Sequence, residues 1–202
     1  MSNRRENGFT LIEVIVAIAV VAILAGIITP SVVKHLDDAK RARAGNDCQV
    51  IGAAVANVYT DVGRWPDLQS GGATGITLLV GEGTTPTNQG AAAAAWVTTG
   101  INGTQGDLLA YHLVVNRPGN QAINIYPITG EVRWRGPYMQ NCPSDPWGRR
   151  YAINIGNMAN NNAVWVISAG PNGIMETAFN QAIPVTGVSL VLTGDDIGYR
   201  MK

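Results

Sequence analysis

The strongest constraint on this chain is an almost unbroken apolar run from Phe9 to Thr29, in which Glu13 is the only charged residue. As an α-helix, a run of this length crosses the hydrocarbon core of a bilayer, which is about 30 Å thick. A secretory signal peptide would have a shorter apolar region that ends at a cleavage site of small residues. Here the run continues into an amphipathic helical pattern. We therefore expect one membrane-spanning segment with the short basic leader on the cytoplasmic side.

Glu13 is unusual because an ionised carboxylate at the bilayer centre costs on the order of 3 kcal/mol, although less near a helix end. If the chain were cut after Gly8, the new amine of Phe9 would lie one helical turn away. The two opposite charges would then neutralise each other within a subunit or between neighbours. Alternatively, Glu13 is an interfacial residue that reaches the lipid headgroups. Because acids inside membranes are usually functional, we interpret Glu13 as a docking group.

After Pro30 the pattern becomes amphipathic, with apolar residues at helical spacing up to Gly63. This predicts one long helix with a kink or local melting at Pro30, and Pro66 prevents its continuation. A globular domain should pack against the apolar stripe of the second half. Cys48 lies on that stripe and is either bonded to Cys142 or a buried thiol.

The remaining chain predicts a small antiparallel sheet. Residues 69–107 read as a loop with one or two short helices. Five segments carry alternating or β-branched residues and are predicted as strands: 111–115, 122–128, 131–135, 151–155 and 163–170. The fold class is therefore α+β, with one very long N-terminal helix, a small antiparallel sheet and a long C-terminal loop.

Neither nucleic-acid binding nor catalysis is indicated. The formal net charge is zero and the basic residues are scattered, so there is no polybasic footprint. His35 and His112 lie far apart without a surrounding Ser, Cys or Asp motif, and the chain has no phosphate loop or CxxC pair. We expect His112 to be a structural histidine within a strand and the protein not to be an enzyme.

The string GFTLIE at 8–13, followed by the apolar span, resembles the class III signal and N-terminal helix of type IV pilins and type II secretion pseudopilins. This resemblance implies cleavage after Gly8 by a prepilin peptidase, N-methylation of Phe9, and roles in assembly for Glu13 and Pro30. It divides the chain into a leader (1–8), a transmembrane and filament-core helix half (9–30), an amphipathic helix half (31–63) and a periplasmic globular domain (64–202).

Motifs in the rest of the chain resemble the G-type major pseudopilin of type II secretion systems. They are RWPD at 64–67, GPY at 136–138, DPWG at 145–148, SAGPNG at 168–173 and GDDI at 194–197. The DPWG unit also reads as a capped turn whose indole fills a gap in the core. The stretch 83–135 is longer than the family pattern, and we assign it no role.

The resemblance implies a structural subunit anchored in the bacterial inner membrane, whose copies stack with minor pseudopilins into a periplasmic filament that drives protein export. An inner-membrane platform with an external ATPase would assemble the filament. Two alternatives stay open. One is a type IV pilin of a surface fibre for adhesion or motility, and the other is a membrane-tethered periplasmic enzyme or binding protein.

In the G-type family a loop calcium is bound by backbone oxygens near the Ser-Ala-Gly segment and by acidic side chains. The matching positions here are Ile167, Ser168, Asn172, Asp195 and Asp196, with Glu176 as a further candidate. From the residues alone, a solvated acidic turn is the expectation. The chain also departs from the family pattern, because Asn172 replaces an aspartate and the segment before Asp195 is long. We carry calcium forward as an expectation.

Overall fold

The computed structural model describes residues 9–69, 75–97, 105–122, 125–184 and 190–202. It divides into two compact units, Met1–Lys40 and Arg41–Lys202. The described part of the first unit, residues 9–40, consists of the first part of one helix and the two residues before it. The second contains the other half of that helix and the globular domain.

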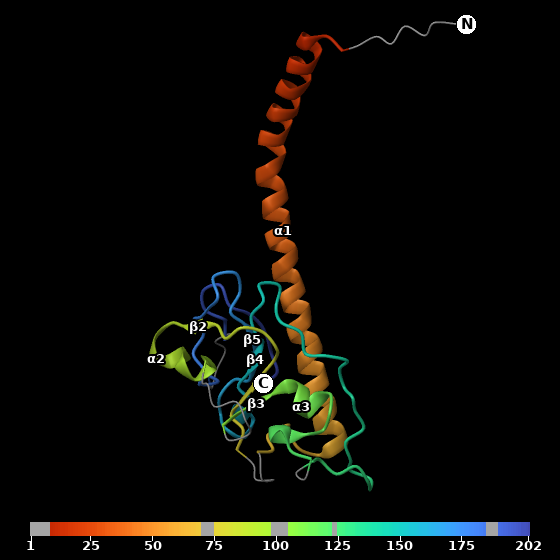
Figure 1. The fold of residues 1–202 in the computed structure, drawn as a ribbon. Coiled ribbons are helices and arrows are strands. Elements are labelled where there is room, and N and C mark those ends of the chain that lie inside the picture. Colours follow the sequence, from red (N-terminus) through yellow and green to blue (C-terminus); the bar gives the residue numbers. More distant parts are fainter. Residues whose placement is uncertain (1–8, 70–74, 98–104, 123–124, 185–189) are drawn as a thin grey trace, which may run out of the picture. The chain divides into compact units, whose positions relative to one another are not determined.

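Helix α1, Leu11–Val62, is 52 residues long, which confirms the predicted long helix (Figure 1). It ends as predicted, because Gly63 adopts a left-handed conformation (φ 72°) and its N–H donates to the carbonyl of Tyr59 at 2.8 Å. Helical structure continues through Pro30, so local melting does not occur there. The proline removes one backbone donor without interrupting the helix.

One face of the second half of α1 is buried, as the apolar stripe predicted. Its buried residues are Ala44, Cys48, Ile51, Gly52, Ala54, Val55, Val58 and Val62. All of them except Ala44 and Gly52 share a core with Leu79, Ile153 and Val166 of the sheet. The helix therefore covers one face of the sheet.

The main sheet is mixed rather than wholly antiparallel, which corrects the expectation. Its strand order is β3-β1-β4-β5-β7, in which β1 and β3 are parallel and the other pairs antiparallel. Two further strands, β2 and β6, form a separate parallel pair. The main strands are β1 (Leu78–Val80), β3 (Gly106–Leu108), β4 (Ala152–Ile153), β5 (Trp165–Ser168) and β7 (Ile197–Arg200); the others are β2 (Thr87–Asn88) and β6 (Ile174–Met175).

The opposite face of the sheet has its own core. Leu78, Ala152 and Ile167 pack there with Trp96 and Phe179, whose rings meet edge to face with centroids 4.8 Å apart. Trp96 lies in η1 (Ala94–Val97), which follows α2 (Gly90–Ala93). These elements confirm the prediction of short helices within 69–107. Because both faces are covered, the central strands β1, β4 and β5 are buried at every residue and are apolar except for Ser168.

The strand predictions are correct for two segments and wrong for three. The segments 151–155 and 163–170 contain β4 and β5. By contrast, 111–115 overlaps helix α3 (Leu109–Leu113), which buries Leu109, His112 and Leu113 at helical spacing. The described residues of 122–128, which exclude 123 and 124, and those of 131–135 form no strand. They are loop, and Arg133 N–H donates to the Asp61 carbonyl at 2.9 Å.

Strand β7 packs along α1 on small helix residues. A Cβ at Gly45 would meet Ile197 at 3.9 Å, and one at Gly52 would meet the ring of Tyr199 at 2.8 Å. Between them, the Cys48 thiol lies 3.8 Å from the Ile197 carbonyl oxygen. The absence of larger side chains at these positions lets the last strand approach the helix closely.

A buried polar cluster secures the region around α3. His112 Nε2 lies 2.9 Å from Asp107 Oδ2, and Nδ1 lies 2.6 Å from the Tyr126 hydroxyl. All three residues are fully buried. A neutral imidazole that donates from Nε2 and accepts at Nδ1 satisfies both contacts. Burial raises the pKa of Tyr126 well above its ordinary value, so its hydroxyl remains a donor. His112 is therefore structural, as expected, although it lies on a helix.

The Tyr126→Phe variant should lower the free energy of unfolding by about 1–3 kcal/mol, because the buried Nδ1 of His112 loses its donor. Urea unfolding of the detergent-solubilised chain, followed by tryptophan fluorescence, measures this. The half-buried Tyr111 provides the matched control, and Tyr111→Phe should change stability much less. Equal effects of the two variants would contradict the assigned role of the cluster.

Candidate assembly and loop sites

Glu13 closes the start of α1 in a reciprocal hydrogen-bonded arrangement with Thr10. The Glu13 carboxylate accepts from the Thr10 N–H at 2.9 Å and from its hydroxyl at 2.8 Å. In return, the Glu13 N–H donates to the Thr10 hydroxyl oxygen at 3.3 Å. This is a capping box, in which the first and fourth residues of a Thr-x-x-Glu sequence satisfy each other's backbone donors. The sequence contains this signal, although our reading of the sequence did not identify it.

The structure describes one side of the predicted cleavage junction. Gly8 lies outside the described residues, whereas Phe9 is described and is 88% exposed. The Glu13 carboxylate already holds the backbone N–H next to Phe9. An amine created at Phe9 would therefore form one residue before the Thr10 N–H that this carboxylate already binds. Cleavage, methylation and the Glu13 docking role stay predictions.

The first half of α1 leaves its apolar side chains uncovered. Every described side chain from residue 9 to residue 39 is exposed. The helix is long and apolar enough to span a membrane. Its surface therefore needs either lipid or other protein around it.

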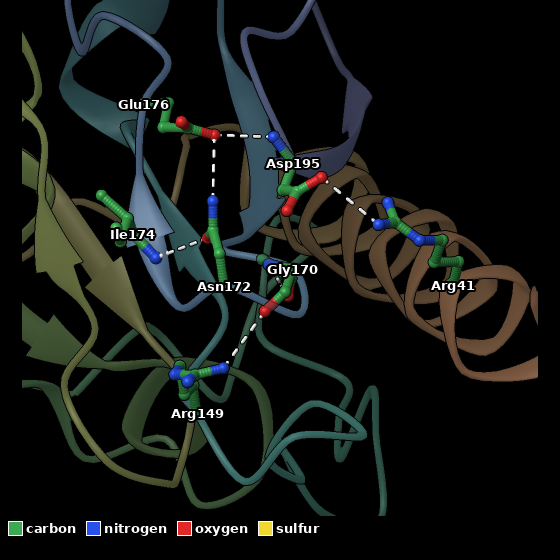
Figure 2. A network of polar contacts seen from close by, with 8 residues as sticks. Arg41, Arg149, Gly170, Asn172, Ile174, Glu176 and Asp195 are labelled. Carbon is green, nitrogen blue, oxygen red and sulfur yellow. Dashed lines mark hydrogen bonds and ion pairs between the residues drawn. The ribbon is translucent and has the colours of Figure 1, made fainter. Parts of the chain in front are cut away.

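Three of the predicted calcium ligands, Asn172, Glu176 and Asp195, lie on two chain segments that the fold brings together (Figure 2). Glu176 Oε2 accepts from the Asp195 N–H at 2.6 Å and from the Asn172 amide at 3.4 Å. The side-chain Oδ1 of Asn172 accepts from the Ile174 N–H at 2.8 Å. Asp195 Oδ1 lies 3.3 Å from the Arg41 guanidinium. Donors from the protein therefore engage Asn172, Glu176 and Asp195.

Asp196 lies deeper between the same loops. Its Oδ2 accepts from the N–H groups of Glu176 and Thr177 at 2.9 and 2.6 Å, whereas its buried Oδ1 has no partner. Burial raises the pKa of this carboxyl above its ordinary value. Ser168 instead donates to Asp145 Oδ2 at 2.6 Å, and Ile167 lies within β5.

The oxygen atoms of these residues do not form a calcium shell in this arrangement. Among the described residues, no three His, Cys, Asp or Glu side chains converge on a common metal position. Calcium needs six to eight oxygen ligands, and the cluster offers one buried oxygen without a partner, Asp196 Oδ1. The arrangement of these oxygens therefore gives the calcium expectation no support, and direct titration is its test.

Arg41 and Arg149 are the members of this network that sequence reasoning missed. Arg149 donates to the Gly170 carbonyl at 3.1 Å from the far side of the loop. No sequence signal could have paired Arg41 with Asp195, because 154 positions separate them. Both contacts depend on the tertiary fold.

The DPWG turn supports the same region. Asp145 Oδ1 accepts from the N–H groups of Trp147 and Arg149 at 3.0 and 2.8 Å, which confirms the predicted cap. The Trp147 indole is only half-buried and belongs to neither core cluster, which corrects the prediction that it fills a core gap.

Cys48 and Cys142 are both buried free thiols in the core beneath α1. Of the two alternatives, the structure contains the buried thiols rather than the disulfide. Burial raises the pKa of both thiols, that of Cys142 to about 12. They are therefore protonated and poorly reactive at neutral pH.

Comparison with known proteins finds two family matches along this chain. The prokaryotic N-terminal methylation motif family matches residues 3–29, and the family of type II secretion system protein G matches residues 85–184. Relatives include the type II secretion system core protein G of Dickeya chrysanthemi, 24% identical over 86% of this chain and 83% of that protein. The same protein of Pectobacterium carotovorum is 26% identical over 87% of this chain and 83% of its own length. No solved structure gives a significant match.

The long apolar helix, its methylation motif and the small sheet on its second half define a pilin-like fold, and the start of the chain carries the motif of the prokaryotic N-terminal methylation family. Within that family, its globular part groups with the protein G pseudopilins of type II secretion systems.

The Thr10→Val variant should loosen the first turn of α1, because it removes the hydroxyl from the capping box. Loss of an N-cap costs about 0.5–2 kcal/mol of local stability. Hydrogen exchange at residues 11–14 in detergent micelles should therefore quicken, whereas Thr10→Ser should retain slow exchange. Similar exchange in the two variants would show that the hydroxyl does not hold the helix start.

Proposed function

We propose that this chain is the structural subunit of a type II secretion pseudopilus. A prepilin peptidase cuts it after Gly8, and the mature chain resides in the bacterial inner membrane as a single-pass protein with its globular domain in the periplasm. Copies then assemble through α1 into a filament that drives export across the outer membrane. The exposed apolar first half of α1, most of which lies within the methylation motif at residues 3–29, is the observation that carries this proposal.

The surface of α1 sets the physics of assembly. Apolar helices that leave lipid for a helix bundle gain little hydrophobic free energy, since lipid tails are as apolar as leucine. Close packing of small residues such as Ala17, Ala22 and Gly26 must supply the attraction. The pairing of Glu13 with the Phe9 amine of the same or a neighbouring copy would set register and polarity.

The energy for extracting subunits would come from an ATPase outside this chain, acting through an inner-membrane platform. Minor pseudopilins would complete the filament. The shared family supports participation in a pseudopilus, and these partners form part of the proposal.

A surface pilin is the second candidate function. The fimbrial protein EcpC of Eikenella corrodens is 34% identical, but over only 40% of this chain and 51% of that protein. The protein G relatives instead match over 86% and 87% of this chain. The greater coverage favours the pseudopilus. Deletion of the gene distinguishes the two, since loss of a pseudopilus subunit blocks protein secretion and loss of a surface pilin leaves secretion intact.

Mass spectrometry of protein purified from membranes should show a mature chain that begins at N-methylated Phe9. This start creates the amine that the assembly model requires one helical turn from Glu13. A chain that retains Met1 in cells with active prepilin peptidase would instead indicate a simple membrane tether.

The Glu13→Ala variant should assemble filaments at a rate reduced about tenfold or more, since loss of an intramembrane charge partner is worth a few kcal/mol. Membrane insertion should not fall, because the variant helix is more apolar. Filament yield and secreted protein are the readouts. The exposed Glu131→Ala variant is the control and should behave as wild type. Normal assembly of Glu13→Ala would leave only the tethering role of the helix.

A further inference from the structure

The C-terminal strand follows one face of α1 over three helical turns. Arg41, Gly45, Cys48 and Gly52 recur at spacings of four, three and four residues, which places them on one side of the helix. Their partners run in order along the C-terminal segment, from Asp195 through Ile197 to Tyr199. We call this contact the α1–β7 seam. Arg41 is at its N-terminal end, where the globular unit begins.

The turn at Asp195 is held closely from several directions. A Cβ at Gly170 would lie 2.1 Å from the Asp195 carbonyl oxygen, and Gly170 has a left-handed φ of 62°. Gly194, with φ 64°, likewise presses against the Glu176 carboxylate. Both positions therefore require glycine. The two loops are in direct contact, with no space between these backbone segments.

Arginine side chains, a side-chain amide and a backbone N–H of the protein itself are the partners of the oxygen atoms around this turn. Figure 2 shows Arg41 reaching Asp195 from α1, while Arg149 holds the Gly170 carbonyl from the opposite side. Glu176 takes an amide from Asn172 and a backbone N–H from Asp195. Asn172 contributes an amide where an aspartate would add a fourth carboxylate. The cluster therefore has less negative charge for a cation to neutralise.

We propose that Arg41 clamps the 193–196 turn onto α1 and that this clamp, together with the internal amide bonds, closes the loop without a divalent cation. The Arg41 side chain acts as a positioning residue that completes the α1–β7 seam. Because Arg41 lies on α1, its guanidinium joins the loop to the helix through one charge and directional hydrogen bonds. A metal bound within the loop would instead join the loop to itself.

The clamp should depend on salt but not on calcium. The Arg41 and Asp195 side chains are 43% and 40% exposed, so screening by salt weakens their attraction. A closed calcium site would respond in the opposite way, since it would tighten with calcium and loosen with chelator. These two responses distinguish the clamp from a metal site.

The test is hydrogen exchange of the full chain in detergent micelles, read at peptides covering residues 193–197. The Asp195 N–H donates to Glu176, so its exchange reports opening of this turn. Arg41→Gln in chelator should quicken exchange roughly two- to fivefold, as expected for an exposed ion pair. Arg41→Lys should restore part of the protection. Arg43→Gln is the matched control, because Arg43 pairs with Asp47 on the same helix and should leave the turn unchanged.

A double-mutant cycle tests the partner. Asp195→Asn should quicken exchange as much as Arg41→Gln, and the double variant should add little. High salt should reduce the difference between wild type and Arg41→Gln. Millimolar calcium should leave wild-type exchange unchanged. The clamp is refuted if calcium slows wild-type exchange strongly, or if Arg41→Gln and Asp195→Asn both exchange as wild type does.

Discussion

The structure depends on a helix that its own chain covers over only half its length. Every described side chain from residue 9 to residue 39 is exposed, and most of those before Pro30 are apolar. A surface of this kind is stable only within lipid or against other apolar helices. The subunit is therefore incomplete by itself. Between Phe9 and Thr29, Glu13 is the one charged group on this surface, and its capping box with Thr10 fixes its carboxylate at the end where a new amine would appear.

The second half of α1, by contrast, has one face covered by the globular domain. Its buried face belongs to the same core as the sheet, and the small residues Gly45 and Gly52 allow β7 to lie close to the helix. The other face of the sheet is covered by the segments around Trp96 and Phe179. This double coverage holds short strands in place that would be unstable alone. One helix thus serves as an anchor for the globular unit and as an uncovered surface for assembly.

Local sequence patterns predicted the long helix well and the short elements poorly. Helix α1 and its end at Gly63 follow from periodicity and from one glycine with positive φ. Strand β1 was missed because Leu78–Val80 is short and buried on both faces, so it lacks alternation. The segment 111–115 was misread because tertiary burial of Leu109, His112 and Leu113 favours helix over the β-propensity of its valines.

The candidate sites also differ in how much of them the local sequence reveals. The Thr10–Glu13 pair is readable from a four-residue pattern, whereas Arg41 meets Asp195 only through the fold. The calcium ligands were inferred from family resemblance, and the donors that engage them here were not visible in that resemblance. Asn172 and the long segment before Asp195 were the departures that the sequence revealed in advance.

Photo-crosslinking from Val16, on the exposed apolar half of α1, tests most directly whether this surface exchanges lipid for other copies of the chain. We predict lipid adducts in membranes where assembly is blocked, and covalent dimers of the chain in assembled filaments. Lipid adducts alone under both conditions would contradict a filament built from these helices.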